Sequence, residues 1–349
     1  MKYCYIIITS LIVALGASVF NCSSTHAEEL TAYEQALNLT RERRFSEAIP
    51  LLEEWCNQYP RDPRGAYLLA QSYMTTRQNE KALERLNIIL EHHPDDERNN
   101  FLMGVLLLPS APDRAETHLQ IAVNAQPDNA QYQHRLGSAL MVQRKHAEAE
   151  APLREAVRLA PNNLNARLDL GRVLLANGKA AEAIPHLEAA TRGNDKEIAY
   201  NMLGTARLQT RDFDGAVSAL NEAAKLNPDD ARVHFNRGIA LEGQLGDQAT
   251  GLDTFRPVIE SYEKAISLNA EVSDYHFRLG NIYETAVRSV YEQTATDESL
   301  AERALDYLAK AKNAYTAADT DAARQRITSV DQIIENIKNP EVIIEEFTE

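Results

Sequence analysis

The stretch from residue 130 to residue 163, AQYQHRLGSALMVQRKHAEAEAPLREAVRLAPNN, decides the fold. It holds Leu136-Gly137, then Ala149 twelve residues after that glycine, and then Leu153. Apolar residues spaced three and four apart form a stripe along one face of a helix, so the stretch predicts two consecutive helices. Because each stripe contains a small residue, we expect Gly137 to face Ala149 and the two helices to pack closely as an antiparallel pair.

The same pattern recurs along the chain, where prolines follow one another at spacings of 34, 33, 34 and 67 residues, the last gap being two periods. Each helix pair leaves an apolar face that only a neighbouring pair can cover, so the pairs are expected to stack into an array. Proline ends the second helix because it has no N–H donor, and the Asn or Asp that follows can cap the next helix. The recurring prolines are Pro60, Pro94, Pro127, Pro161 and Pro228.

The pattern resembles the tetratricopeptide repeat family, and the resemblance covers nearly all of the chain beyond its first residues. Leu69-Ala70, Leu170-Gly171 and Leu203-Gly204 repeat the Leu-small pair of the quoted stretch. The resemblance implies an all-α fold, a right-handed superhelical solenoid of about eight antiparallel helix pairs with a C-terminal capping helix. The solenoid spans residues 29–318, in units of residues 29–62, 63–96, 97–129, 130–163, 164–196, 197–230, 231–272 and 273–318.

The last two units depart from the fixed period. Unit 231–272 holds about 8 extra residues and unit 273–318 about 12, so longer helices or protruding loops are expected there. Residues 319–338 place Ile327 and Val330 on one stripe, which predicts an amphipathic helix that covers the last apolar face. Residues 339–349 form an acidic tail.

Composition and charge limit the function classes. The chain has 349 residues, with 36 Lys and Arg against 51 Asp and Glu, a net charge of −15. Such a surface repels nucleic acid, so no nucleic-acid partner is expected. Strand-like alternation is rare, which excludes a β-sandwich or barrel. Cys56 is the only cysteine beyond the first 27 residues, so no intrachain disulfide is expected once these are removed.

Residues 1–27 are predicted to be a signal peptide. Lys2 precedes an apolar run over residues 5–20, and Thr25-His26-Ala27 has the small residues that a signal peptidase prefers. Cleavage after Ala27 leaves Glu28 first and predicts an exported protein, periplasmic or secreted. No later segment is expected to span a membrane.

Two alternatives to cleavage remain open. Lipid attachment at Cys22 is less expected, because Asn21 stands where a lipobox has a small residue. An uncleaved anchor is the other alternative.

No motif for catalysis is found: there is no phosphate loop, no HExxH, no dinucleotide fingerprint and no Gly-x-Ser-x-Gly. The sequence therefore predicts a protein that is not an enzyme and has no cofactor and no metal site. His92-His93 is expected to lie at a solvated helix end rather than to bind a metal. Cys56 is expected to be a buried thiol, with a reactive thiol or an interchain bridge as the alternative.

The resemblance also implies a binding groove, since in the family the second, fifth, sixth and ninth positions of the first helices touch ligands. At these positions Asn can bond an extended backbone and Arg can meet acidic groups. The family's carboxylate clamp is not matched, because Asn201, Thr205 and Asp274 stand where Lys, Asn and Lys belong. The candidate groove residues are Arg135, Arg172, Asn201, Arg232, Asn236, Arg278 and Asn281.

These observations predict an exported, non-catalytic scaffold or adaptor that binds a protein or peptide, with an acidic segment as one candidate, on its concave face in the cell envelope. One alternative is an assembly factor or spacer of an envelope secretion, pilus or polysaccharide-export machine. Another is the substrate-recruiting subunit of a separate enzyme.

Overall fold

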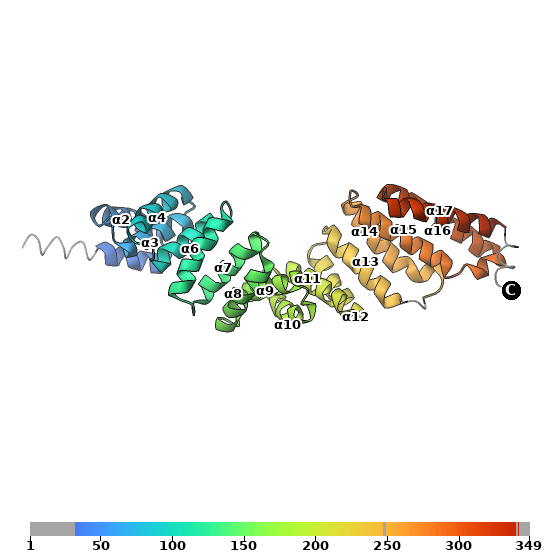
Figure 1. The fold of residues 1–349 in the computed structure, drawn as a ribbon, viewed down its shortest axis with the longest axis horizontal. Helices are drawn as coiled ribbons and strands as arrows, with labels where there is room; N and C mark the ends of the chain where they lie inside the picture. The colour runs from blue at the N-terminus through green and yellow to red at the C-terminus, as the bar shows by residue number, and fades with distance from the viewer. Residues whose placement is uncertain (1–31, 247–248, 340, 342–349) are drawn as a thin grey trace, which may run out of the picture. The chain divides into compact units, whose positions relative to one another are not determined.

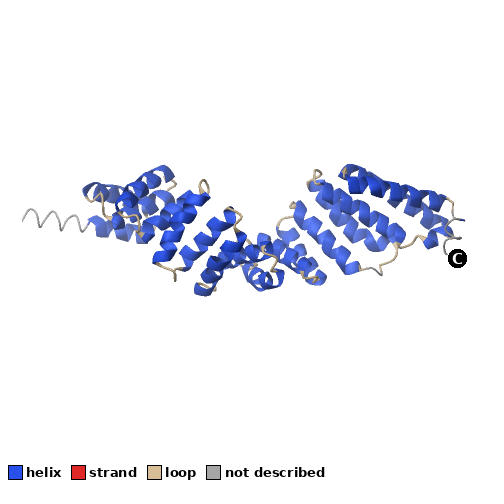
Figure 2. Ribbon diagram, in the orientation of Figure 1, coloured by secondary structure: helices blue, strands red, loops and turns tan. Residues whose placement is uncertain are grey.

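The computed structural model describes residues 32–246, 249–339 and 341. Within these ranges every regular element is a helix and no strand occurs (Figure 2). The chain divides into two compact units, unit 1 from Met1 to Pro161 and unit 2 from Asn162 to Glu349.

Unit 1 contains four helix pairs in which each helix packs against the next along the chain (Figure 1). The first pair consists of helical residues 32–41 and α2. The core of the first two pairs includes Leu52, Trp55 and Cys56, all buried. The helices are α2 (Phe45–Gln58), α3 (Pro63–Thr75), α4 (Asn79–His92), α5 (Glu97–Leu107), α6 (Pro112–Ala125), α7 (Ala130–Val142) and α8 (His146–Leu159).

Unit 2 contains four further pairs and one terminal helix. The first helices also contact one another, since α11 packs against both α9 and α13. The elements are α9 (Leu164–Ala176), α10 (Ala180–Ala190), α11 (Lys196–Gln209), α12 (Phe213–Leu226), α13 (Ala231–Leu245), η1 (Leu252–Phe255), α14 (Arg256–Leu268), α15 (Ser273–Arg288), η2 (Glu292–Ala295), α16 (Glu298–Ala318) and α17 (Asp321–Lys338). The prediction of an all-α fold of eight helix pairs and a terminal helix is confirmed.

Asn and Asp side chains begin many of the first helices. Asn129 Oδ1 accepts from the N–H of Tyr132 at 3.2 Å, and Asn163 Oδ1 accepts from the N–H of Ala166 at 3.1 Å. Each of these bonds satisfies an N–H group that has no partner within its helix, which stabilises the helix by about 1 kcal/mol. The caps predicted after the repeat prolines are thus present.

The packing of the small residues differs from the prediction at one point. A Cβ atom added at Gly137 would lie 2.5 Å from Leu153 Cγ, so the nearest neighbour of this glycine is Leu153 rather than Ala149. Gly171 and Gly204 face Leu187 and Leu220 in the same way. Each glycine therefore leaves a notch in the first helix, and a leucine of the second helix fills it. The two helices can pack closely because the glycine has no side chain.

Among the described extra residues of the last two pairs, two short 3-10 turns join the core, and α15 and α16 are longer than the helices of the regular pairs. Leu252 and Phe255 of η1 are buried, and η1 packs against α14 and α15. Asp253 accepts from Arg303 Nη2 at 2.9 Å, which ties η1 to α16. Buried residues of η1, α14, α15, α16 and α17 form one core cluster.

The terminal helix α17 packs against α16 and buries Val330, Ile333 and Ile337. Ile327, expected on the same stripe, is half-buried. The helix begins at Thr320, whose hydroxyl accepts from the N–H of Ala323 at 3.1 Å. It covers the apolar face that α16 would otherwise expose.

The predicted signal peptide, the alternative lipid site at Cys22 and most of the acidic tail lie outside the described residues. Among the helices that the structure does describe, none has both the length and the apolar character to cross a membrane.

Candidate binding surface on the first helices of unit 2

A cluster of uncharged polar side chains lies between α11 and α13. Asn236 Nδ2 lies 3.4 Å from Thr205 Oγ1 and 3.5 Å from Asn201 Oδ1, and all three residues are half-buried. Thr205 also donates to the backbone carbonyl of Asn201 at 3.0 Å. We call Asn201, Thr205 and Asn236 the amide cluster. The helical repeat explains it, because equivalent turns of neighbouring first helices meet side by side.

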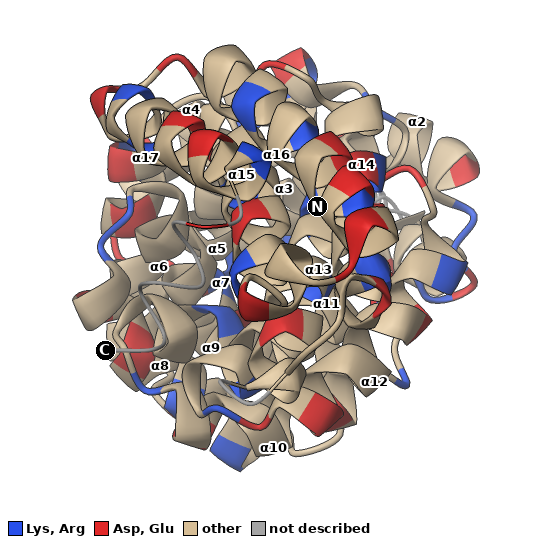
Figure 3. Ribbon diagram, turned by 90° about the vertical axis from the view of Figure 1, so that its right-hand side faces the viewer, with Lys and Arg blue, Asp and Glu red and all other residues tan. Residues whose placement is uncertain are grey.

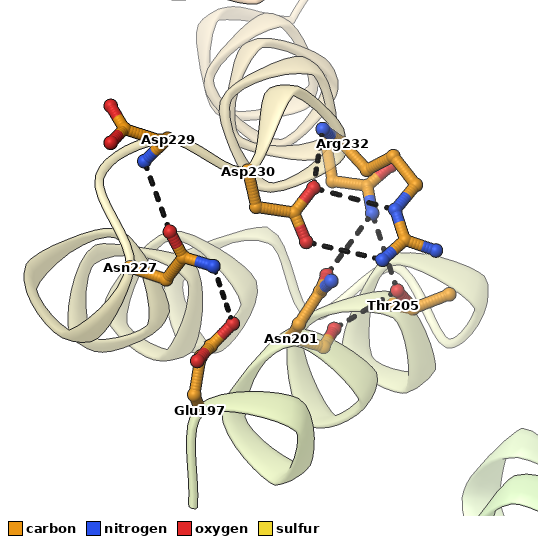
Figure 4. A network of polar contacts seen from close by, with 8 residues as sticks. Glu197, Asn201, Thr205, Asn227, Asp229, Asp230 and Arg232 are labelled. Atoms are coloured by element: carbon orange, nitrogen blue, oxygen red, sulfur yellow. Dashed lines mark hydrogen bonds and ion pairs between the residues drawn. The ribbon is translucent and has the colours of Figure 1, made fainter.

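One ion pair and one hydrogen bond lie beside the amide cluster, near the starts of α13 and α11. Asp230 caps α13 and accepts from Arg232 Nη2 at 3.2 Å, while Asn227 donates to Glu197 of α11 at 2.8 Å (Figure 4). Burial would raise the pKa of Asp230, but the hydrogen bonds from the Arg232 side chain and backbone outweigh it and lower that pKa. Asp230 therefore stays ionised and keeps Arg232 at the edge of the cluster.

Arg278 lies on the same side of unit 2, where α15 follows α13. Its Nη1 is 3.7 Å from Glu242 Oε2, and the same oxygen accepts from the hydroxyl of Tyr262 at 2.7 Å. Phe235 of α13 and Tyr275 of α15 have ring centroids 4.5 Å apart, which joins the two helices nearby. Glu242 thus links a surface arginine to a buried tyrosine.

The structure brings only some of the predicted groove residues together. Asn201, Asn236 and Arg232 meet at the α11–α13 contact. Asn281 is turned inward, since its Oδ1 accepts from the hydroxyl of Tyr315 at 2.7 Å. Arg135 belongs to unit 1, where it is half-buried on α7. Asn281 is half-buried, and this bond ties α15 to α16.

The predicted arginines of unit 2 are not free positive charges. Arg172 Nη1 lies 3.8 Å from Asp169, Arg232 pairs with Asp230, and Arg278 pairs with Glu242. Figure 3 shows the same mixture more widely, with basic and acidic residues interspersed along the helices. The sequence rule missed Asp230 and Glu242 because they lie outside the four ligand-facing positions. The sequence signal that was available is a carboxylate one helical turn after a small residue of the first helix, as Glu242 is after Gly238.

The described residues offer little for catalysis. No group of three or more His, Cys, Asp or Glu within them could hold a metal ion. His93 Nε2 lies 2.8 Å from the carbonyl oxygen of Arg61, which agrees with the predicted structural place at a helix end. Cys56 is buried and unpaired, and its burial raises the pKa of the thiol to about 11. A thiol with this pKa is protonated at neutral pH and is a poor nucleophile.

Two family models, both described as tetratricopeptide repeat, match the chain. One matches residues 111–164 and 201–256, and the other matches residues 39–99 and 140–206. Together these ranges span more than half of the sequence. No curated protein sequence matches the chain.

Solved structures with a similar fold include YrrB, described as a TPR protein with an unusual peptide-binding site. It is 20% identical, with a TM-score of 0.47, over 53% of this chain and 93% of its own. MamA from Desulfovibrio magneticus RS-1 is 20% identical, with a TM-score of 0.44, over 50% of this chain and 95% of its own. Another structure of MamA is 22% identical, with a TM-score of 0.42, over 54% and 92%.

Proposed function

The chain belongs to the tetratricopeptide repeat family, and from that premise we propose that it is a non-catalytic scaffold that binds a protein or peptide through the first helices of unit 2. Such repeats are suited to protein–protein interaction. The observation that carries the proposal is the amide cluster at the α11–α13 contact.

The geometry of the amide cluster supports this role. Its hydrogen bonds, at 3.4 and 3.5 Å, are longer than the usual 2.9 to 3.0 Å, so they are weak. An Asn amide has two N–H donors and a carbonyl acceptor, and these match the groups that repeat along an extended peptide backbone. A bound backbone can replace the weak internal contacts with shorter ones.

The arginines beside the amide cluster set the kind of partner. Because Arg232 and Arg278 already face carboxylates of their own chain, an acidic segment would have to displace Asp230 or Glu242 to pair with them. We therefore propose that the partner is held mainly by backbone hydrogen bonds and apolar contacts at this site, and that charge plays the smaller part.

The test replaces both amides. A partner recovered with the full chain is purified and titrated against wild type and against the double variant Asn201→Ala with Asn236→Ala. Loss of two hydrogen bonds of about 1 kcal/mol each should weaken binding by at least about tenfold. Asn313→Ala is the matched control, because Asn313 is exposed on the second helix α16. If the control weakens binding and the double variant does not, the proposed surface is wrong.

We also propose that the protein is exported and works in the cell envelope, with the leader of residues 1–27 as the support for this. Mass analysis of the protein from its host should give a chain that begins at Glu28. A chain that keeps Met1, or one that begins at an acylated Cys22, would contradict cleavage after Ala27.

A further inference from the structure

Four arginines adopt a backbone conformation that favours glycine. Arg43, Arg77, Arg144 and Arg211 have φ between 60° and 62°, and each lies in the turn between the first and second helix of its pair. Residues other than glycine rarely adopt positive φ, because the Cβ atom is crowded there. The same residue type at the same repeat position four times calls for an explanation.

The turn itself does not need arginine. In the fourth pair the N–H of Arg144 donates to Met141 and the N–H of Lys145 donates to Leu140, both at 2.9 Å, a pattern that closes a helix with a left-handed residue. The fifth pair closes in the same way with Gly178 at φ 75°. A Cβ atom at Gly178 would meet nothing within 4 Å, so glycine and larger residues both fit the turn.

Arg211 lies over the ring of Phe213, but the side chains of the other three arginines make no such contact with a described ring. Arg43, Arg77 and Arg144 are exposed, and within the described part of the chain their guanidinium groups form no hydrogen bond or ion pair. Several other arginines of unit 1 are paired, among them Arg154, which lies 2.9 Å from Glu150, and Arg158, which lies 2.6 Å from Glu155. A strained backbone that carries an unpaired charge indicates a function outside the fold.

We propose that Arg43, Arg77 and Arg144 form a binding edge on unit 1 for an acidic polypeptide segment. Stacking of repeats places equivalent turn positions along one edge of an array, so the three arginine turns share one edge, with the turn of the third pair between Arg77 and Arg144. Guanidinium groups pair with carboxylates through two parallel hydrogen bonds, and an extended acidic chain can present carboxylates along such an edge. This edge is separate from the amide cluster of unit 2, so either surface can fail without the other.

Charge favours a polypeptide over an anionic membrane. Unit 1 has 16 Lys and Arg against 20 Asp and Glu, a net charge of −4. A broad anionic surface would meet the acidic residues around the edge, such as Glu42 and Glu80, as well as the arginines. A single extended chain can contact the arginines without contacting these acidic residues. Repulsion from acidic residues more than about 10 Å away is then screened at 0.1 M salt.

The experiment uses a fluorescent oligoglutamate peptide and the full chain. Wild type should bind the peptide, with affinity that falls as salt rises, and Arg43→Gly with Arg77→Gly and Arg144→Gly should weaken binding by about tenfold. Glycine suits the turn, so circular dichroism should be unchanged. The charge-matched control replaces Arg98, Arg154 and Arg158, which are already ion-paired, by Gln and should bind as wild type does.

Three outcomes would overturn the proposal. The peptide could fail to bind wild type, or the triple variant and the charge-matched control could lose affinity equally, which would indicate only net charge. Binding to phosphatidylglycerol vesicles that depends on the three arginines, without binding to the peptide, would assign the edge to a membrane instead. A change at the amide cluster, Asn236→Ala, should leave peptide binding at the edge intact.

Discussion

The regular helix pairs α7–α8, α9–α10 and α11–α12 and the lengthened pairs α13–α14 and α15–α16 fill the glycine notch with different residues. In the regular pair α7–α8, Gly137 faces Leu153. In the lengthened pairs the partner is a tyrosine, and a Cβ added at Gly238 or Gly280 would lie 2.5 or 2.7 Å from Tyr262 or Tyr315. A phenol in the core brings a hydroxyl that must find a hydrogen-bond partner.

A tyrosine in the notch also changes which charged groups lie beside the core. Tyr262 donates to Glu242, and Tyr315 donates to Glu284 at 2.8 Å. Each of these carboxylates then faces an arginine, Arg278 or Arg288. In the lengthened pairs the carboxylates beside the notch are therefore bonded to a tyrosine and paired with an arginine of the same chain. The regular pairs have an apolar notch, and the turn arginines Arg144 and Arg211 have no carboxylate partner among the described residues.

Moving tyrosine into a regular pair should have the largest effect. Leu153→Tyr adds volume in the Gly137 notch and buries a hydroxyl without an acceptor. Overpacking costs about 1 to 3 kcal/mol, and an unsatisfied buried polar group costs about as much again. Urea unfolding should show a loss of about 3 kcal/mol or more, measured in wild type and variant at the same pH.

The lengthened pairs show how to reverse that loss. Met141 stands four residues after Gly137, as Glu242 stands four after Gly238. The double variant Leu153→Tyr with Met141→Glu should therefore recover part of the stability, and Met141→Glu alone should not stabilise. If the double variant is no more stable than Leu153→Tyr, the hydroxyl partner is not what distinguishes the two kinds of pair.

Removing one hydroxyl from a lengthened pair should have a smaller effect. Tyr262→Phe keeps the ring in the Gly238 notch but deprives Glu242 of its short hydrogen bond. We expect a loss of about 1 to 3 kcal/mol in the free energy of unfolding, the range for a buried polar group left without its partner. Calorimetry can measure it. Tyr291→Phe, at a half-buried tyrosine whose hydroxyl accepts from Asn336, is a control in the same unit and should cost less.

The sequence predicted the number of helix pairs because the period repeats so often, but it did not predict the notch partner. In an antiparallel pair, two residues lie opposite each other when they are equally many residues away from the turn that joins the helices. Gly137 lies seven residues before Arg144, while Ala149 lies only five after it and Leu153 nine after. A helical side chain leans toward its N-terminus, so Leu153 covers the level of Gly137. The spacing of small residues alone does not show which way the side chains of the second helix lean.

The candidate site was predicted in part for a related reason. The ligand-facing positions on the first helices selected Asn201 and Asn236, whose side chains approach each other, and Arg232 at the start of the same helix as Asn236. Carboxylates that pair with the arginines come from a cap, Asp230, and from the end of a helix, Glu242. Whether a charge is free depends on contacts between separate elements, and these follow from the packed fold and not from position within one repeat.

High pH offers a further test of the tyrosine in the lengthened pair α13–α14. Burial, with the nearby Glu242, raises the pKa of Tyr262 well above its usual value of 10.0. A raised pKa in the folded state means that the stabilising contribution is complete below pH 10 and is lost as pH rises through the folded pKa. The free energy of unfolding should fall above pH 10, by at most about 1.4 kcal/mol per pH unit for this tyrosine. Tyr262→Phe should flatten that decline, and an unchanged slope would contradict it.

The smallest effect is expected from exchanging the turn residues of two pairs of otherwise similar length. Arg77→Gly removes the steric cost of holding an arginine in the left-handed conformation, which is about 1 to 2 kcal/mol. It also raises the conformational entropy of the unfolded chain, which offsets about 0.4 to 1 kcal/mol of that gain in stability. Gly178→Arg reverses both effects in a turn with open space. We therefore expect a gain of about 1 kcal/mol or less from the first change and a loss of similar size from the second, read from urea midpoints. If Arg77→Gly destabilises the protein instead, Arg77 contributes to folding stability. The turn arginines of the regular pairs would then resemble the ion-paired arginines of the lengthened pairs in being structural.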